Sequence, residues 1–255
     1  MKTRLTLWTI LMALILCGSF IFAEDTANVT AITDSTEGLD LQAVSELFKE
    51  SENLEAFEKS LNDPEVSINN LDLDENGEVD YIRVLEEISG DAHIIILQAS
   101  LGEDEYQDVA TIEVEKNEDD YTMQVVGNED IYGPDCYIVP SNVHIKTWPV
   151  IAFIYKPGYK PYRSVYRYGV YPKWWKPYHP VARAAYRNRV VVYHNRAGFK
   201  YAKTGPVHVT KRIKYKPRTS VLVKRRVVRT PHGTRVITTR KKVKHPPVAR
   251  KKARR

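Results

Sequence analysis

The chain has 255 residues, of which 43% are hydrophobic, and it carries a formal charge of +6 from 38 Lys and Arg against 32 Asp and Glu. This length allows one or two domains. The small net charge conceals a polarised chain: every Asp and Glu lies between Glu24 and Asp135, whereas 32 of the 38 cationic residues follow Asp135. Residues 24–135, with 32 carboxylates and 4 cations, carry −28, and residues 136–255 carry +32. This asymmetry excludes an evenly mixed surface and indicates an interaction surface or tail.

Residues 1–23 have the parts of a secretory signal peptide. Two basic residues precede an uncharged apolar run from Leu5 to Ala23. The pattern predicts export to the periplasm, the outer envelope or the medium. An uncleaved membrane anchor is the alternative, because about 18 apolar residues can cross a bilayer. Residues 24–38 are polar and lack periodicity, which predicts a flexible acidic leader.

Residues 39–140 have the patterns of an acidic domain that begins with two short helices. In LDLQAVSELFKES, Asp40 is a plausible N-cap and the apolar residues recur three or four positions apart. A second helix is expected from an N-cap at Asn53 to Leu61, and the Asn-Asp-Pro that follows ends it.

The hydrophobic period then falls to two, which predicts strands joined by short turns. The expected strands are 66–68, 79–88, 93–101, 106–115 and 121–126. The third is apolar on both faces, as in a central strand that is covered on both sides. The predicted fold class is therefore α+β, with two short N-terminal helices packed on an antiparallel meander sheet, followed by a basic, aromatic, largely irregular or disordered tail.

A candidate calcium loop lies between the helices and the strands. In LDLDENGEVDYIRV, the spacing D-x-D-x-N-G-x-x-D offers oxygen ligands from Asp72, Asp74, Asn76, Glu78 through its carbonyl, and Asp80. Calcium takes six to eight such oxygens. The alternative is a plain hairpin, because Asn-Gly is a favoured two-residue turn whose flanking aspartates can be solvated charge. Either way we expect a structural role.

The first positions of this loop resemble an EF-hand, but the twelfth position is Arg83 in place of the bidentate Glu of that family. The loop is more similar to the D-x-D-x-[DN]-G-x-x-D loops between strands of integrin-type propellers, a likeness that covers nine residues and implies no propeller. The wider stretch, including INNLDLDENGEVDYIRV, YQDVATIEVEK and WWKPYHP, resembles a family of exported bacterial proteins without assigned function. That resemblance implies export and the loop, and no activity.

Residues 141–255 form the basic part, in which Tyr and Trp alternate with Lys, Arg and Pro. Recurrent prolines predict extended backbone, and the high charge predicts disorder or partial order. A hairpin is expected around Pro231-His232-Gly233. Three partners fit: an anionic envelope surface or acidic glycan, the acidic domain itself through self-association, and nucleic acid. Export favours the envelope surface or glycan, and self-association ranks next.

No sequence motif indicates catalysis. The chain has no HExxH, CxxC, GxSxG or phosphate-binding glycine loop. Cys136, the cysteine that remains once the signal is removed, could pair with His144 as a nucleophile and base, but we expect a buried structural thiol. His93 lies in mid-strand and is expected at the core edge. The expected protein is a binding or structural protein, with a hydrolase as the remote alternative.

Overall fold

The computed structural model describes residues 38–118, 120–141, 144–206, 215–223, 225–230 and 233–238. Its helices are α2 (Leu41–Glu50), α3 (Leu54–Leu61), α4 (Glu129–Tyr132), the 3-10 turn η1 (Ile145–Thr147), α5 (Pro149–Ile154) and α6 (Arg183–His194). Its strands are β1 (Ile82–Ser89), β2 (Ala92–Gly102), β3 (Glu105–Lys116), β4 (Tyr121–Gly127), β5 (Tyr137–Pro140), β6 (Phe199–Ala202), β7 (Arg225–Thr230) and β8 (Gly233–Thr238).

The two predicted N-terminal helices are confirmed, and both begin at the predicted caps. The Asp40 side chain accepts a hydrogen bond from Ala43 N at 2.9 Å, and the Asn53 side chain accepts one from Ala56 N at 2.8 Å. Such side-chain acceptors satisfy N–H groups that have no partner in the first helical turn.

An antiparallel meander of six strands, in the order β1-β2-β3-β4-β5-β6, forms the main sheet. It confirms the predicted α+β class. The segment 66–68, which was expected as a strand, is not one in the structure, and β5 and β6 were not predicted. Strand β2 is buried along its whole length, as expected for a central strand.

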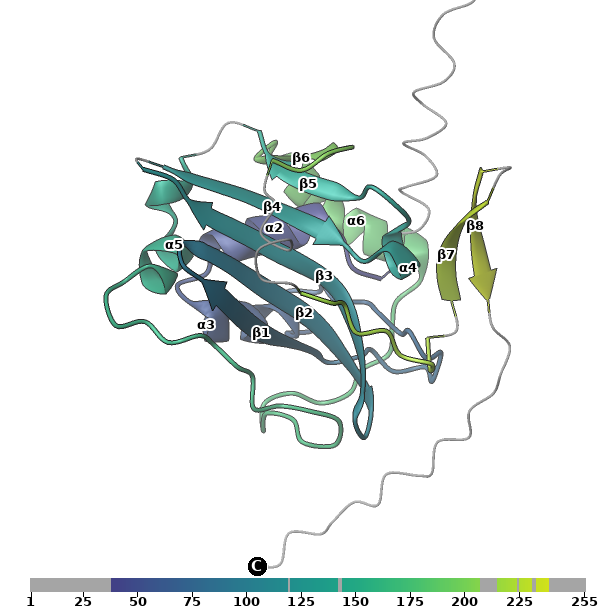
Figure 1. Cartoon of the computed structure of the whole chain (residues 1–255). Coiled ribbons are helices and arrows are strands. Elements are labelled where there is room, and N and C mark those ends of the chain that lie inside the picture. Colours follow the sequence, from purple (N-terminus) through teal and green to yellow (C-terminus); the bar gives the residue numbers. More distant parts are fainter. Residues whose placement is uncertain are drawn as a thin grey trace, which may run out of the picture.

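The main core lies between the inner face of the sheet and the helices, and Figure 1 shows α2, α3 and α6 on that side. Inner-face residues of β2 such as Ile95 and Leu97 belong to the same cluster as Phe48 and Phe57, whose rings contact edge to face with centroids 5.4 Å apart. The outer face of β2 carries a smaller cluster with Ile94 and Ile96.

The basic half continues this core beyond residue 140. Strand β6 pairs with β5, α6 packs against α2, and Trp148, Tyr186 and Phe199 are buried in the same cluster as the acidic half. The Tyr186 hydroxyl accepts from Asp40 N at 2.7 Å and donates to the Ile68 carbonyl at 2.8 Å. The expected irregular tail is thus irregular in backbone over much of 155–182, yet its aromatic side chains are packed against the folded domain.

Residues 215–223 cross the outer face of the sheet, in front of β2 and β3 in Figure 1. The Arg218 carbonyl accepts from Asp108 N at 2.9 Å, and Val223 is buried in the main core. Beyond them, β7 and β8 pair antiparallel, which confirms the hairpin predicted there.

No helix in the described ranges combines the length and the apolar character needed to span a bilayer. The signal peptide or anchor (1–23), the leader up to residue 37 and the last residues of the basic tail lie outside the described residues.

Candidate functional site

The acidic loop, residues 72–80, is closed by its own backbone donors. Asn76 N donates to Asp72 Oδ1 at 2.9 Å and to Asp74 Oδ1 at 3.1 Å, while Gly77 N donates to Asp72 Oδ2 at 2.9 Å. Glu78 N donates to Asn76 Oδ1 at 2.7 Å. Gly77 has φ +89°, a conformation that side chains with a Cβ disfavour. These contacts hold the first three predicted ligands on one turn.

The fifth predicted ligand, Asp80, lies at the buried end of this loop. Its Oδ2 accepts from Leu73 N at 2.7 Å, and its side chain is 6% exposed. The basic half contacts residues 77–79 of the loop. The Tyr178 carbonyl accepts from Val79 N at 2.7 Å, and the His179 ring lies 2.6 Å from the Gly77 carbonyl. The loop is therefore anchored to the packed structure at Val79 and Asp80, while its tip, residues 75–78, is exposed.

Calcium binding to this loop stays a prediction. Asp72, Asp74 and Asn76 present oxygens of the kind that calcium takes, but several of them already accept backbone hydrogen bonds. Within the described ranges, no group of three or more His, Cys, Asp or Glu side chains is arranged to hold a metal ion. A calcium loop also takes amide and carbonyl oxygens as ligands.

Buried carboxylates join the acidic half to the basic half. Glu58 accepts from Tyr81 OH at 2.8 Å, Val84 N at 3.0 Å, Tyr162 OH at 3.2 Å and Ser164 Oγ at 2.6 Å. Burial raises the pKa of Glu58, while these hydrogen bonds lower it. All four donors are neutral, and two of them come from the basic half.

Glu86 is held in a similar way on β1. It accepts from Tyr159 OH at 2.5 Å and from Tyr162 N at 2.9 Å, and the His93 Nδ1 lies 2.7 Å away. The His93 ring also contacts the Tyr155 ring, with centroids 4.3 Å apart. His93 is thus a buried side chain tied to a carboxylate, near the edge of the core where the sequence placed it.

The cations of the basic half have a different position. Every Lys and Arg side chain described between residues 144 and 223 is exposed. They are Lys146, Lys156, Lys160, Arg163, Arg167, Lys173, Lys176, Arg183, Arg187, Arg189, Arg196, Lys200, Lys203, Lys216 and Arg218. One of them, Arg196, forms an ion pair with Glu50 at 2.5 Å, and both partners are largely exposed. The tyrosines described between residues 144 and 223 are buried or half-buried, whereas these cations are exposed.

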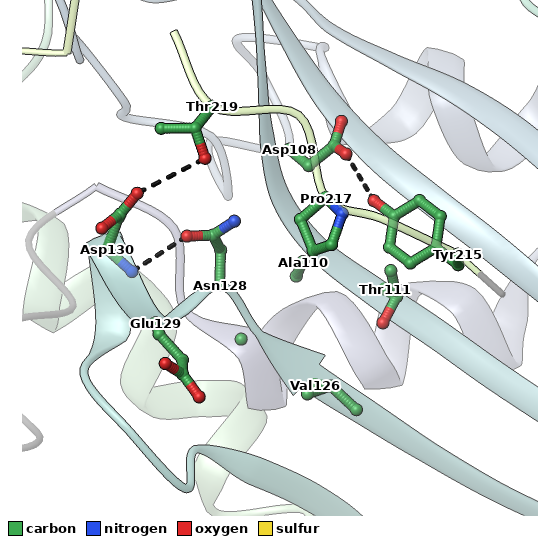
Figure 2. A pocket seen from close by; sticks show the side chains of 11 residues that line it. Asp108, Ala110, Thr111, Val126, Asn128, Glu129, Asp130, Tyr215, Pro217 and Thr219 are labelled. Carbon is green, nitrogen blue, oxygen red and sulfur yellow. Dashed lines mark hydrogen bonds between the residues drawn. The ribbon is translucent and has the colours of Figure 1, made fainter. Parts of the chain in front are cut away.

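A pocket of about 500 Å³ lies on the outer face of the sheet, between β3, β4, α4 and residues 215–219. In Figure 2, Pro217 and Ala110 lie between its two polar ends. At one end the Tyr215 hydroxyl donates to Asp108, and at the other Thr219 Oγ1 lies 3.5 Å from Asp130 Oδ2.

A β-bulge places Asp108 at this pocket. Leu97 pairs with Ala110 and the next residue of β2, Gln98, pairs with Asp108, so Val109 is the extra residue. Asp108 also accepts from Gln98 Nε2 at 2.5 Å and from Arg218 N at 2.6 Å. Strict alternation along β3 could not reveal this carboxylate, because the bulge changes which residues face outward.

The chemistry of this pocket suits a cationic or hydroxyl-rich ligand more than an anion. Its lining includes Asp108, Glu129 and Asp130, and the lining holds no Lys, Arg, His or Cys among the described residues.

The Cys136–His144 pair is not assembled. Cys136 is 4% exposed, whereas His144 is exposed, and no hydrogen bond joins the two in the described part of the chain. Burial, with the nearby Asp40 charge, raises the pKa of the Cys136 thiol to about 12. The thiol is thus protonated at neutral pH and is a poor nucleophile. A buried, free Cys136 agrees with the sequence expectation.

Comparison of the chain with protein-family models, with curated proteins and with solved structures gives no match. The resemblance to a family of exported bacterial proteins, drawn from the sequence motifs, therefore stays a prediction.

Proposed function

We propose that this chain is an exported, non-enzymatic binding protein that attaches to an anionic envelope surface or acidic glycan through the cations of its basic half. The observation that carries this proposal is the exposure of every described Lys and Arg between residues 144 and 223. Folding against the acidic half uses mainly tyrosine and serine hydroxyls and backbone N–H groups, and the cations stay at the surface.

The electrostatics fit such a role. Exposed cations at this density create a positive field that attracts polyanions, and the attraction weakens as salt screens it. Nucleic acid is the weaker candidate, since a chain that is exported would meet envelope polyanions first. Calcium, if the loop 72–80 takes it, would stabilise the domain without contacting the partner.

Self-association is the second candidate, and one observation favours it. The acidic half leaves carboxylates exposed at Glu52, Glu65, Glu75 and Glu78, on the same molecule that exposes the cations. Two copies could therefore pair through opposite charges. Sedimentation at low and high salt would distinguish a self-associating chain from a monomer that binds foreign polyanions.

The test uses the whole chain from residue 24 onward. Vesicles with anionic lipid, neutral vesicles and an acidic polysaccharide are each mixed with the protein at about 0.05 M and about 0.5 M NaCl. We expect binding to an anionic probe at low salt and loss of most of it at high salt. Binding that ignores salt, or no binding to any anionic probe, would contradict the proposal. Fractionation of expressing cells tests export separately.

A further inference from the structure

A second pocket, of about 440 Å³, lies where the basic half turns over the start of α3. The segment KPGYKPYR, residues 156–163, forms one wall, and the first residues of α3 form the other. The turn is made at Gly158, which has φ +74° and has no atom within 4 Å of the place where a Cβ would be. The pocket is thus open at this turn, and its volume suits one small ligand.

Aromatic rings form the inner side of this pocket. Phe153, Tyr159 and Tyr162 line it and are each half-buried. The Tyr159 hydroxyl donates to Glu86 and the Tyr162 hydroxyl donates to Glu58, so buried carboxylates hold both rings in place. The Phe153 and Tyr159 rings contact edge to face, with centroids 5.8 Å apart. Rings held in this way give the pocket a preformed apolar side, called the aromatic platform below.

Three cationic side chains line the same pocket as this platform. Lys156, Lys160 and Arg163 all line the pocket and are all exposed. The Lys156 ammonium lies 3.7 Å from the centre of the Phe153 ring, so its charge sits over the aromatic surface. Arg163 offers a planar fork of donors that suits a carboxylate or a sulfate.

We propose that this pocket binds an acidic sugar unit, with its apolar ring face on the aromatic platform and its carboxylate or sulfate on Lys160 and Arg163. This inference rests on the proposed function. It adds the place on the cationic surface where binding is specific and the class of ligand that binds there. A sugar ring combines an apolar face, hydroxyls and an acid group in a small volume, which matches an aromatic pocket with a cationic rim.

Glu55 on the opposite wall favours a sugar over a membrane. Its exposed carboxylate lines the pocket and would repel a continuous layer of anionic headgroups. The same carboxylate can accept hydrogen bonds from sugar hydroxyls, which lipid phosphates do not supply. Mixed charge in one small pocket therefore points to a single ligand that carries both an acid and hydroxyl groups.

The test compares two double variants that remove the same charge. Lys160→Ala with Arg163→Ala changes the pocket, and Lys173→Ala with Lys176→Ala changes exposed cations elsewhere in the basic half. The probes are an oligouronate, a neutral oligosaccharide of equal length, vesicles with anionic phospholipid, and a single-stranded DNA oligonucleotide. Thermal melting confirms that each variant is folded before binding is measured.

We expect the pocket variant to lose about tenfold more oligouronate affinity than the matched variant, which is a difference of about 1.4 kcal/mol. Both variants should lose vesicle binding to a similar degree. Phe153→Leu, which keeps an apolar side chain without the ring, should weaken oligouronate binding and leave vesicle binding unchanged.

Equal losses of oligouronate affinity in the two double variants would overturn the pocket and leave the general cationic surface standing. A selective loss of DNA or vesicle binding in the pocket variant would also overturn it, in favour of that ligand. If the unmodified protein binds none of the anionic probes, the proposed function itself fails.

Discussion

The two halves of this chain use their charges in opposite ways. In the acidic half, carboxylates such as Glu58, Glu86, Asp108 and Glu113 are buried. In the basic half, the described cations are exposed, and tyrosines make the contacts with the acidic half. Opposite net charges of −28 and +32 suggest attraction by ion pairs, but the buried boundary is built mainly from hydrogen bonds that hydroxyls and backbone N–H groups donate to carboxylates, beside one His194–Asp40 pair at 2.8 Å.

This difference has a physical reason. A buried ion pair must recover the desolvation of two charges, whereas a tyrosine hydroxyl brings a donor together with a large apolar ring. Lys and Arg can stay hydrated at the surface while their neighbours pack. Four predictions, from the largest expected effect to the smallest, test or sharpen this contrast.

The strongest test is Glu58→Ala. It would leave the hydroxyls of Tyr81 and Ser164 and the Val84 N–H without their acceptor in a buried site. We expect a loss of about 3 kcal/mol in the free energy of unfolding, measured by urea denaturation. Glu55→Ala on the exposed face of α3 is the matched control and should change stability by less than about 0.5 kcal/mol. Equal effects would mean that the buried contacts do not hold the halves together.

Glu113 provides a pH test on the outer face. Its Oε2 accepts from Gln124 Nε2 at 2.7 Å, and burial raises its pKa to about 7. Because the folded state then binds a proton that the unfolded state releases, this group makes stability fall as pH rises from about 4.5 to 7. Glu113→Gln should raise stability by about 1–3 kcal/mol at pH 8 and change it little at pH 4. The measurement is urea denaturation at both pH values. A gain of the same size at pH 4 would show that folding does not raise the pKa of Glu113.

Calcium binding by the loop 72–80 is tested by thermal unfolding with calcium and with a chelator. Binding with a dissociation constant of about 0.1 mM would add about 1.4 kcal/mol at 1 mM calcium, or roughly 3–6 °C in melting temperature. Asp74→Asn should remove this rise, and magnesium at the same concentration is the control. Identical melting curves with calcium and chelator would leave the loop as a plain turn.

The smallest effect is expected from salt on the fold itself. Since the contacts described between the halves are mainly hydrogen bonds from neutral donors, about 0.5 M NaCl should change the free energy of unfolding by less than about 1 kcal/mol. The same salt should remove most binding to anionic probes. A large fall in the free energy of unfolding at high salt would instead show that ion pairs hold the two halves together.

The sequence predicted those elements that depend on interactions between neighbouring residues. The caps at Asp40 and Asn53, the period of the two helices, the alternation along β1 and the apolar run of β2 predicted these elements well. Each depends on neighbours within a few residues, so the sequence records it directly. The candidate loop was recognisable for the same reason, because its ligands fall within nine residues.

Pairing between segments that lie far apart in the chain could not be predicted from the sequence. β5 and β6 are short and lie about 60 residues apart in the chain, and α6 has no side-chain cap at its start. The pocket at Lys160 likewise needs α3 and residues 153–163 to meet. No local signal in these segments indicates which partner they find.

The sequence by itself determined the separation of charge, the acidic α+β core and the aromatic content of the basic half. Only the tertiary structure decided that the tyrosines of that half turn inward to buried carboxylates while its cations remain in water. The reason is that burial depends on which surfaces meet: a ring with one hydroxyl is stabilised against a carboxylate in the core, and a full charge is better solvated outside.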